Sequence, residues 1–149
     1  MAPSGALHRL IYMSSAVGVL RADELDRILL RAKASNAGAG ITGLLLLQEG
    51  TFLQVIEGSP AGVLSLMGRI RRDRRHTGLA LLESHACAAR AFPDSPMAYV
   101  APRNLTPGLR DQLGELLAAV RRREALGSGE SLTDQLWSVL SVFQAAEAA

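Results

Sequence analysis

Residues 51–57 constrain the fold more than any other stretch, because one amide side chain, Gln54, interrupts an otherwise apolar segment of strand-forming residues. Aromatic and β-branched residues predict a buried strand here. A buried amide left without partners costs about 1–3 kcal/mol, so Gln54 must bind within the protein or to a bound polar group. Tyr12 is a second polar residue inside a predicted central strand, residues 10–14. The two polar side chains are therefore candidates to meet across a sheet.

The apolar pattern predicts alternating strands and helices up to residue 100. Strands are expected at residues 7–14, 41–48, 51–57, 79–87 and 97–100, and helices at 21–35 and 60–75. Glu49 and Gly50 form a short hairpin turn, while Ser59 and Pro60 are typical of a helix N-cap and first turn. The resulting βαββαββ order predicts an α+β fold, an open sheet with two helices on one face.

A different pattern follows Pro102. Two apolar stripes with helical spacing occupy residues 107–123 and 131–146, separated by a Gly-Ser-Gly stretch. We therefore divide the chain into residues 1–102 and a helical extension, residues 103–149, packed on the same domain. The two stripes either cover the free face of the sheet or, for the last helix, bind a partner.

Composition excludes several classes of function. The 149 residues, 48% hydrophobic, fit one compact domain, and a net charge of +2 does not indicate a nucleic-acid-binding protein. The single cysteine excludes an internal disulfide, and three scattered histidines show no metal-ligand spacing. No apolar run reaches the roughly 18 residues of a membrane span. We expect a cytoplasmic protein without a metal, a membrane or a nucleic-acid partner.

Four segments in matching order and spacing resemble the BLUF family of blue-light sensors that use flavin. They are residues 10–15, 35–45, 52–58 and 69–76, and the resemblance extends over about residues 6–100. It implies a ferredoxin-like sheet with the isoalloxazine ring held between two helices. It also implies a non-covalently bound flavin, with FAD favoured and FMN or riboflavin left open.

The resemblance assigns Tyr12 and Gln54 to the photoactive pair. Blue light is expected to drive electron and proton transfer from Tyr12 toward flavin, after which the hydrogen bonds of Gln54 rearrange. A phenol is oxidisable and can release a proton, and an amide has a donor end and an acceptor end that can be exchanged. Asn36 matches the asparagine that binds the polar edge of the ring. Its alternative role is to end the first helix, because Asn in a Gly-containing stretch such as residues 36–40 commonly does so.

Further residues match positions that contact the cofactor. Arg69, Asp73 and His76 match residues on the second helix or at its end, where their spacing places them on one helical face. A surface ion pair is the alternative for Arg69 and Asp73, and a cation at the helix C-terminus is the alternative for His76. Ser35 and Ile28 complete the expected cofactor-binding set.

The last strand departs from the family pattern. Met97 retains the methionine near the glutamine, although an ordinary core residue is its alternative. Ser95 replaces the tryptophan of many members, which leaves the signal relay through this strand open.

We expect a photoreceptor and not a turnover enzyme. Light would alter binding to an unknown protein partner or self-association, with homodimers or larger rings formed through the C-terminal helices. Two alternatives remain at this point, a light-insensitive interaction module and a small hydrolase resembling acylphosphatase. The hydrolase would need a Gly-rich anion loop with an arginine, which the chain lacks.

Overall fold

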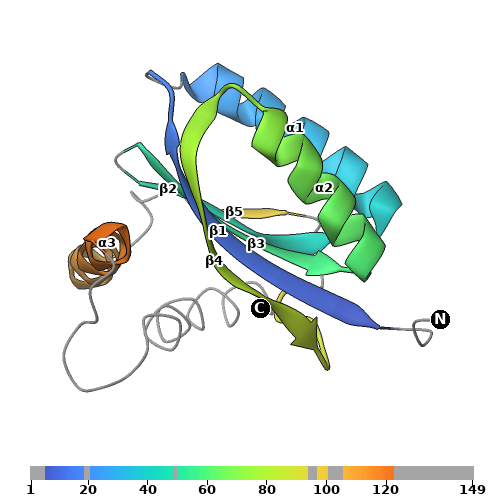
Figure 1. Ribbon diagram of the computed structural model, residues 1–149. Helices are drawn as coiled ribbons and strands as arrows, with labels where there is room; N and C mark the ends of the chain where they lie inside the picture. The colour runs from blue at the N-terminus through green and yellow to red at the C-terminus, as the bar shows by residue number, and fades with distance from the viewer. Residues whose placement is uncertain (1–5, 19–20, 49, 94–96, 101–105, 123–149) are drawn as a thin grey trace. The chain divides into compact units, whose positions relative to one another are not determined.

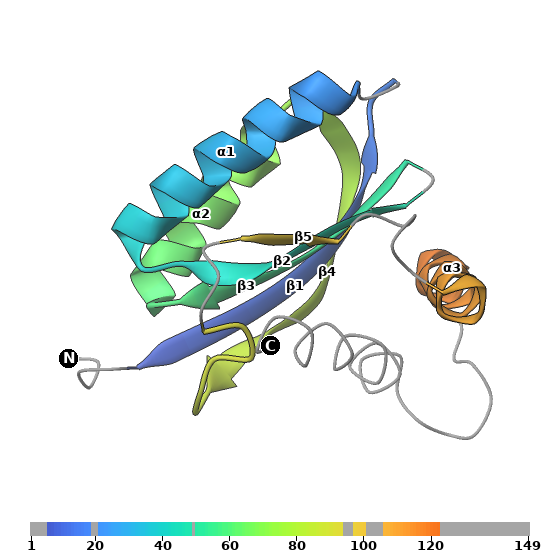
Figure 2. The same ribbon diagram turned by 180° about the vertical axis from the view of Figure 1, so that it is seen from behind.

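The computed structural model describes residues 6–18, 21–48, 50–93, 97–100 and 106–122. The chain divides into two compact units, Met1–Val100 and Ala101–Ala149, and each is described by itself. In the first unit, a five-stranded sheet has the order β4-β1-β3-β2-β5. Helices α1 and α2 cover one face of this sheet (Figure 1), which Figure 2 shows from behind. The predicted βαββαββ order and α+β class are confirmed.

The sheet is antiparallel apart from one edge. Strand β1 pairs with both β3 and β4, and β2 pairs with β3, all antiparallel, whereas the short β5 runs parallel to β2. The elements of this unit are β1 (Leu7–Ala16), α1 (Ala22–Ala39), β2 (Thr42–Gln48), β3 (Thr51–Gly58), α2 (Pro60–Arg72), β4 (His76–Cys87) and β5 (Ala98–Val100).

Strand β3 is buried along its whole length, because it lies between β1 and β2 and is covered by the helices. The hairpin register pairs Gln48 with Thr51, so a two-residue turn joins β2 and β3 as predicted. In the β1–β3 pair, Tyr12 stands directly opposite Gln54. Directly opposed residues project from the same face of a sheet, so the predicted meeting of the two side chains follows from this register.

The core of this unit consists of two apolar clusters, one under each helix. The cluster under α2 contains Leu10, Tyr12, Ile41, Ile56, Val63 and Met67. The cluster under α1 contains Leu29, Leu45, Phe52 and Met97. Each helix thus buries its apolar stripe against a different part of the sheet, and the groove between the helices lies above β3.

The ends of both helices differ from the sequence prediction. Helix α1 continues through Asn36 and ends at Gly40, whose φ of 70° is the left-handed conformation that glycine adopts at low cost. Asn36 is therefore a buried residue of the last turn, so the alternative that it ends the helix is wrong, as is the predicted helix end at residue 35. Helix α2 ends at Arg72, so the shared helical face predicted for Asp73 and His76 is also wrong. Asp73 is instead the C-cap residue.

The second unit contains α3 (Pro107–Arg122), which confirms the first of the two predicted C-terminal helices. The Thr106 hydroxyl caps this helix by accepting a hydrogen bond of 3.2 Å from the Leu109 amide. The predicted helix at residues 131–146 lies outside the described residues, and its packing stays a prediction. Among the helices that the structure describes, none has the length and apolarity needed to cross a membrane.

Replacing Gly43 by alanine should destabilise the protein by more than about 3 kcal/mol, because the new Cβ would overlap the backbone carbonyl of Val55 on β3. Gly38→Ala is the matched control. Gly38 lies inside α1 with open space around it, so alanine there should stabilise the helix by up to about 1 kcal/mol. Chemical denaturation of both variants measures the difference, and equal stabilities would contradict the close packing of β2 on β3.

Candidate functional site

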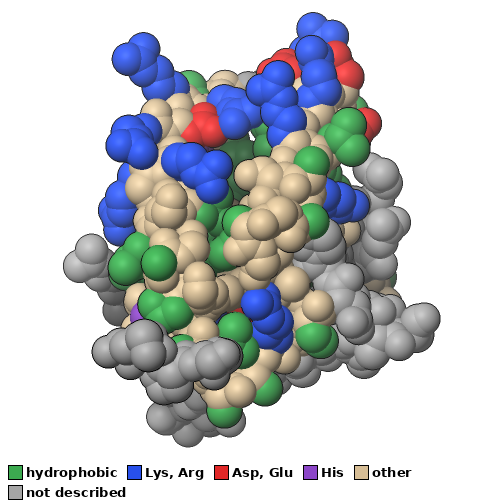
Figure 3. All heavy atoms as spheres, turned by 90° about the vertical axis from the view of Figure 1, so that its right-hand side faces the viewer, with side chains coloured by type: hydrophobic (Ala, Val, Ile, Leu, Met, Phe, Trp, Pro, Cys, Tyr) green, Lys and Arg blue, Asp and Glu red, His purple; other side chains and the backbone are tan. Residues whose placement is uncertain are grey.

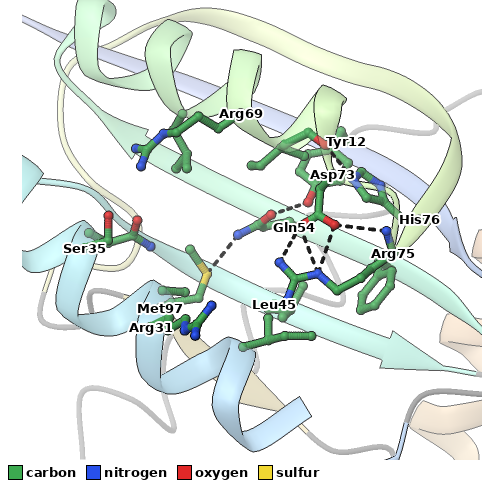
Figure 4. Close-up of a pocket in the computed structure, with 16 residues that line it drawn as sticks. Tyr12, Arg31, Ser35, Leu45, Gln54, Arg69, Asp73, Arg75, His76 and Met97 are labelled. Carbon is green, nitrogen blue, oxygen red and sulfur yellow. Dashed lines mark hydrogen bonds and ion pairs between the residues drawn. The ribbon is translucent and has the colours of Figure 1, made fainter. Parts of the chain in front are cut away.

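A cavity of about 260 Å³ opens between α1 and α2 above the centre of β3. Side chains from both helices and from the sheet line it, as Figure 4 shows. The predicted site residues all line this one cavity: Tyr12, Ile28, Ser35, Asn36, Gln54, Arg69, Asp73, His76 and Met97. Residues far apart in the sequence are thus brought together, although contact with a cofactor stays a prediction for each.

A chain of hydrogen bonds forms the floor of the cavity. The Tyr12 hydroxyl donates to Oε1 of Gln54, and Nε2 of Gln54 donates to the Met97 sulfur at 3.3 Å. All three side chains are buried, and Met97 is 0% exposed. A thioether is a weak acceptor, so the amide can exchange this bond for a stronger one at little cost. The arrangement makes Gln54 the polar residue most easily rearranged.

Burial also controls the protonation of Tyr12. Removal from water raises the pKa of the Tyr12 phenol well above its ordinary value, and the negative charge of Asp73 raises it further. The phenol therefore keeps its proton at neutral pH and acts as the donor to Gln54. A proton held at this position leaves only when the phenol itself becomes more acidic.

Asp73 is held in an ion pair at one end of the cavity. Its carboxylate accepts hydrogen bonds from the backbone and side-chain nitrogens of Arg75, both at 2.9 Å. These bonds lower the pKa of Asp73 and raise that of Arg75. The alternative pairing of Asp73 with Arg69 is therefore not the one that the structure contains.

His76 begins β4 instead of ending a helix, and both ring nitrogens are engaged. Nε2 lies 2.7 Å from the Ile70 carbonyl oxygen, which requires a proton on this nitrogen, and Nδ1 lies 2.9 Å from the Ser14 hydroxyl. The ring centroid is 6.2 Å from that of Tyr12 and 6.4 Å from that of Phe52. His76 thus forms a fixed wall beside the phenol.

Helix α1 supplies the other side of the cavity. Asn36 is 3% exposed and lies at the inner end, whereas Ser35 is exposed at the opening. Arg31, one helical turn before Ser35, also lines the cavity. The sequence interpretation did not identify Arg31 or Arg75 as site residues, nor the apolar wall of Leu45, Phe52, Leu66 and Ile70. The i, i+4 spacing from Ser35 was the available signal for Arg31.

A buried carboxylate, also missed from the sequence, holds the segment that leads to Met97. Glu57 at the end of β3 is 0% exposed and accepts hydrogen bonds from Arg9 at 3.0 Å and from the backbone amides of Ala91 and Phe92 at 2.7 and 2.9 Å. Four lone-pair positions on one carboxylate allow this number of partners. The segment after β4 is thereby fixed to the same strand that carries Gln54.

Arg90 reinforces this attachment. Its guanidinium donates to the Gly40 carbonyl oxygen and the Thr42 hydroxyl, both at 2.8 Å, and to the Glu57 carbonyl oxygen at 3.1 Å. The C-terminal end of α1, the start of β2 and the end of β3 therefore meet at one side chain. Ser95, the position of the missing tryptophan, lies outside the described residues.

The chemistry of the cavity fits a flavin. Its walls are apolar, as a flat aromatic ring requires, and two buried amides, Asn36 and Gln54, supply donors and acceptors for a ring edge with carbonyl and imide groups. Arginines stand at the exposed side, where the polar tail would leave. The ring of a flavin therefore matches the apolar walls and the hydrogen-bonding groups of this cavity.

The raised pKa of Tyr12 predicts a loss of stability at alkaline pH. In the unfolded chain a tyrosine ionises near pH 10, while buried Tyr12 stays protonated, so above this pH the unfolded state binds fewer protons than the native state. The free energy of unfolding should then fall by up to about 1.4 kcal/mol per pH unit, an effect absent below pH 10. Urea unfolding between pH 9 and 11 should show a steeper decline for the wild type than for Tyr12→Phe. Parallel curves would refute the buried, protonated phenol.

Comparisons with known proteins agree with this geometry. A family model described as BLUF, sensors of blue-light using FAD, matches residues 7–98. A photoactivated adenylate cyclase subunit beta from Euglena gracilis is 33% identical over 113 residues, which are 74% of this chain and 13% of the relative. The chain thus spans about an eighth of that relative's length.

Solved structures show the same fold. BlrB, a BLUF protein in its dark state, superposes with a TM-score of 0.73 at 26% identity, covering 93% of this chain and 97% of BlrB. Klebsiella pneumoniae BlrP1, solved with FMN and cyclic diGMP, gives a TM-score of 0.67 at 30% identity, covering 93% of this chain and 34% of BlrP1. These matches favour the photosensor over the hydrolase considered from the sequence. The chain belongs to the BLUF family of flavin-dependent blue-light sensors.

Proposed function

We propose that Tyr12 and Gln54 are the light-responsive pair of this photoreceptor, beside a non-covalently bound flavin whose physiological form is FAD. The observation that carries the proposal is the buried hydrogen-bond chain from Tyr12 through Gln54 to Met97 at the floor of the cavity. FAD is the flavin that the family description names, and BlrP1 has been solved with FMN.

Bound flavin supplies the absorption of blue light and, once excited, a strong electron acceptor. Among the described residues that line the cavity, Tyr12 is the only phenol or indole, so it is the side chain that can give up an electron. Loss of an electron makes a phenol strongly acidic, and the hydrogen bond to Gln54 offers the proton an immediate acceptor at Oε1. The high pKa of Tyr12 in the dark prevents this transfer without light.

A proton arriving at Gln54 changes what the amide can donate and accept. The Nε2 bond to the Met97 sulfur is the weakest contact of the amide and is the first to be exchanged. Asn36 would remain in place to bind the polar ring edge, while Ile28, Ser35, Arg69, Asp73 and His76 line the surrounding wall. The change at Met97 reaches β5, which begins at the next residue.

We propose that the output is a change in binding to another chain or in self-association through the C-terminal helices, without enzymatic activity of this chain, in the cytoplasm. The Euglena relative carries the name of an adenylate cyclase subunit, but this chain matches only 13% of it.

Replacing Tyr12 by phenylalanine or Gln54 by leucine should abolish the light response while flavin stays bound. The first change removes the electron and proton donor, and the second removes the amide that rearranges. Visible absorption before and after blue light measures the response as a small reversible red shift of the flavin bands. Tyr99→Phe, at the chain's other tyrosine, should retain the shift. A shift that persists in Tyr12→Phe would refute the assignment.

If self-association is the output, the molar mass in solution should differ between darkness and continuous blue light. Size-exclusion chromatography with light scattering measures it, with Gln54→Leu as the variant that cannot switch. Equal masses of the wild type in both states would refute light-controlled self-association and leave binding to another protein as the output.

A further inference from the structure

Glu57 is a charged residue that the proposed light reaction does not use. Figure 3 shows Lys, Arg, Asp and Glu side chains at the surface around the hollow between the helices, whereas Glu57 is 0% exposed. It stands three residues after Gln54 on β3, so the two side chains project from opposite faces of the sheet. Glu57 accordingly does not line the cavity. A fully buried carboxylate is costly unless it is paired and hydrogen bonded, so its partners indicate what it does.

Both carboxylate oxygens of Glu57 hold the chain just after β4. Oε2 accepts hydrogen bonds from the Arg9 guanidinium at 3.0 Å and from the Ala91 amide at 2.7 Å, and Oε1 accepts one from the Phe92 amide at 2.9 Å. All of these partners are donors, and an ionised carboxylate offers acceptors only. A glutamine would have nearly the same shape but would turn an NH₂ group toward one of the donors. The charge and the acceptors of Glu57, and not its size, therefore fix residues 91 and 92.

The fixed residues restrict where Met97 can lie. Phe92 is 0% exposed and precedes Met97 by only five residues. On the other side, β5 begins at the residue after Met97 and pairs with β2. Glu57 and Gln54 belong to the same buried strand, which is paired on both sides. The anchor of the segment before Met97 and the amide that the Met97 sulfur contacts are therefore fixed relative to each other.

We propose that Glu57 is a positioning residue for the light reaction. By holding the amides of Ala91 and Phe92, its carboxylate keeps the Met97 sulfur against Nε2 of Gln54 and thereby sets the lifetime of the lit state. The dark arrangement of Gln54 includes the 3.3 Å bond to this sulfur, which recovery in darkness re-forms. A displaced sulfur changes the energy of that arrangement and so the rate of return. The inference rests on the proposed function for the lifetime, whereas the position of Met97 is a property of the chain itself.

NMR of the full-length chain in darkness measures the position of Met97, with the methyl groups of its four methionines labelled with ¹³C. Met97→Leu identifies the Met97 resonance. Glu57→Gln should shift this resonance by more than its linewidth and leave in place that of Met67, which packs under α2. Glu83→Gln is the matched control, because Glu83 is a carboxylate of β4 that pairs with His85, and it should move neither resonance.

Recovery after blue light tests the consequence for the lifetime. Glu57→Gln should change the rate constant of dark recovery about threefold or more, the size expected when one weak hydrogen bond is gained or lost. In a Met97→Leu background, where no sulfur contacts Gln54, the same substitution should change the rate by less than about 1.5-fold. Leucine replaces methionine with little change in volume, so the core stays filled. A general loss of stability, or removal of a negative charge that acts at a distance, would change both backgrounds alike.

Arg90→Gln is a second variant, for use if Glu57→Gln is too unstable to purify. Arg90 is half-buried and donates to the Gly40 carbonyl oxygen and the Thr42 hydroxyl, both at 2.8 Å. Its replacement therefore loosens the same segment without removing the buried carboxylate. The Met97 resonance should shift in the same direction as in Glu57→Gln and by a smaller amount.

An unchanged Met97 resonance in Glu57→Gln, with that of Met67 also in place, would overturn the inference. Equal changes of the recovery rate with and without the Met97 sulfur would overturn it as well. In both cases the photoreceptor itself would stand, because the wild type still responds to blue light. A wild type without any light response would instead refute the proposed function, and the Met97 resonance would still decide whether Glu57 holds this residue in position.

Discussion

The hydrogen bond between Tyr12 and Gln54 is the contact around which the rest of the site is arranged. Antiparallel pairing of β1 with β3 places the two residues opposite each other, and burial under two helices removes the water that would compete for their polar groups. An unpaired phenol or amide would be costly there, so each satisfies the other. The third partner is only a thioether. All three side chains are therefore hydrogen bonded, but the bond to the Met97 sulfur is weak and can be exchanged. A site that must rearrange needs this combination of full pairing and one weak contact.

The separation of the core into two clusters creates the space that the site occupies. Helix α2 packs over β1 and β3, and α1 packs over β2 and β3, so apolar side chains meet the sheet on both sides of the groove and leave its centre open. A cavity lined by residues already fixed in well-packed elements loses little freedom when it is filled, which favours tight binding of a rigid ring.

The sequence was sufficient for the sheet and for the centre of the site, because alternation and register act over short distances. Tyr12 and Gln54 stand out as polar residues in apolar strands, and their meeting follows from strand pairing. The ends of the helices could not be read in the same way. Asn36 in the Gly-containing stretch 36–40 resembles a helix terminus, yet the left-handed turn falls on Gly40, where no side chain opposes it. Glu57 reads as a solvent-facing residue at the end of a strand, and only the fold brings Ala91 and Phe92 onto it. Arg31 escapes notice because an arginine on a helix is ordinarily a solvated cation.

The chain is attached to the sheet differently before and after Met97. Before Met97, the buried Glu57 carboxylate accepts hydrogen bonds from two consecutive backbone amides and forms an ion pair with an arginine. Arg90 connects the same region to the end of α1 and the start of β2. After Met97, three residues of β5 pair with the edge of the sheet. The described residues before Met97 are thus attached to α1, β2 and β3, whereas β5 after it pairs with β2. A displacement of Met97 would therefore break fewer contacts at β5 than at residues 90–92.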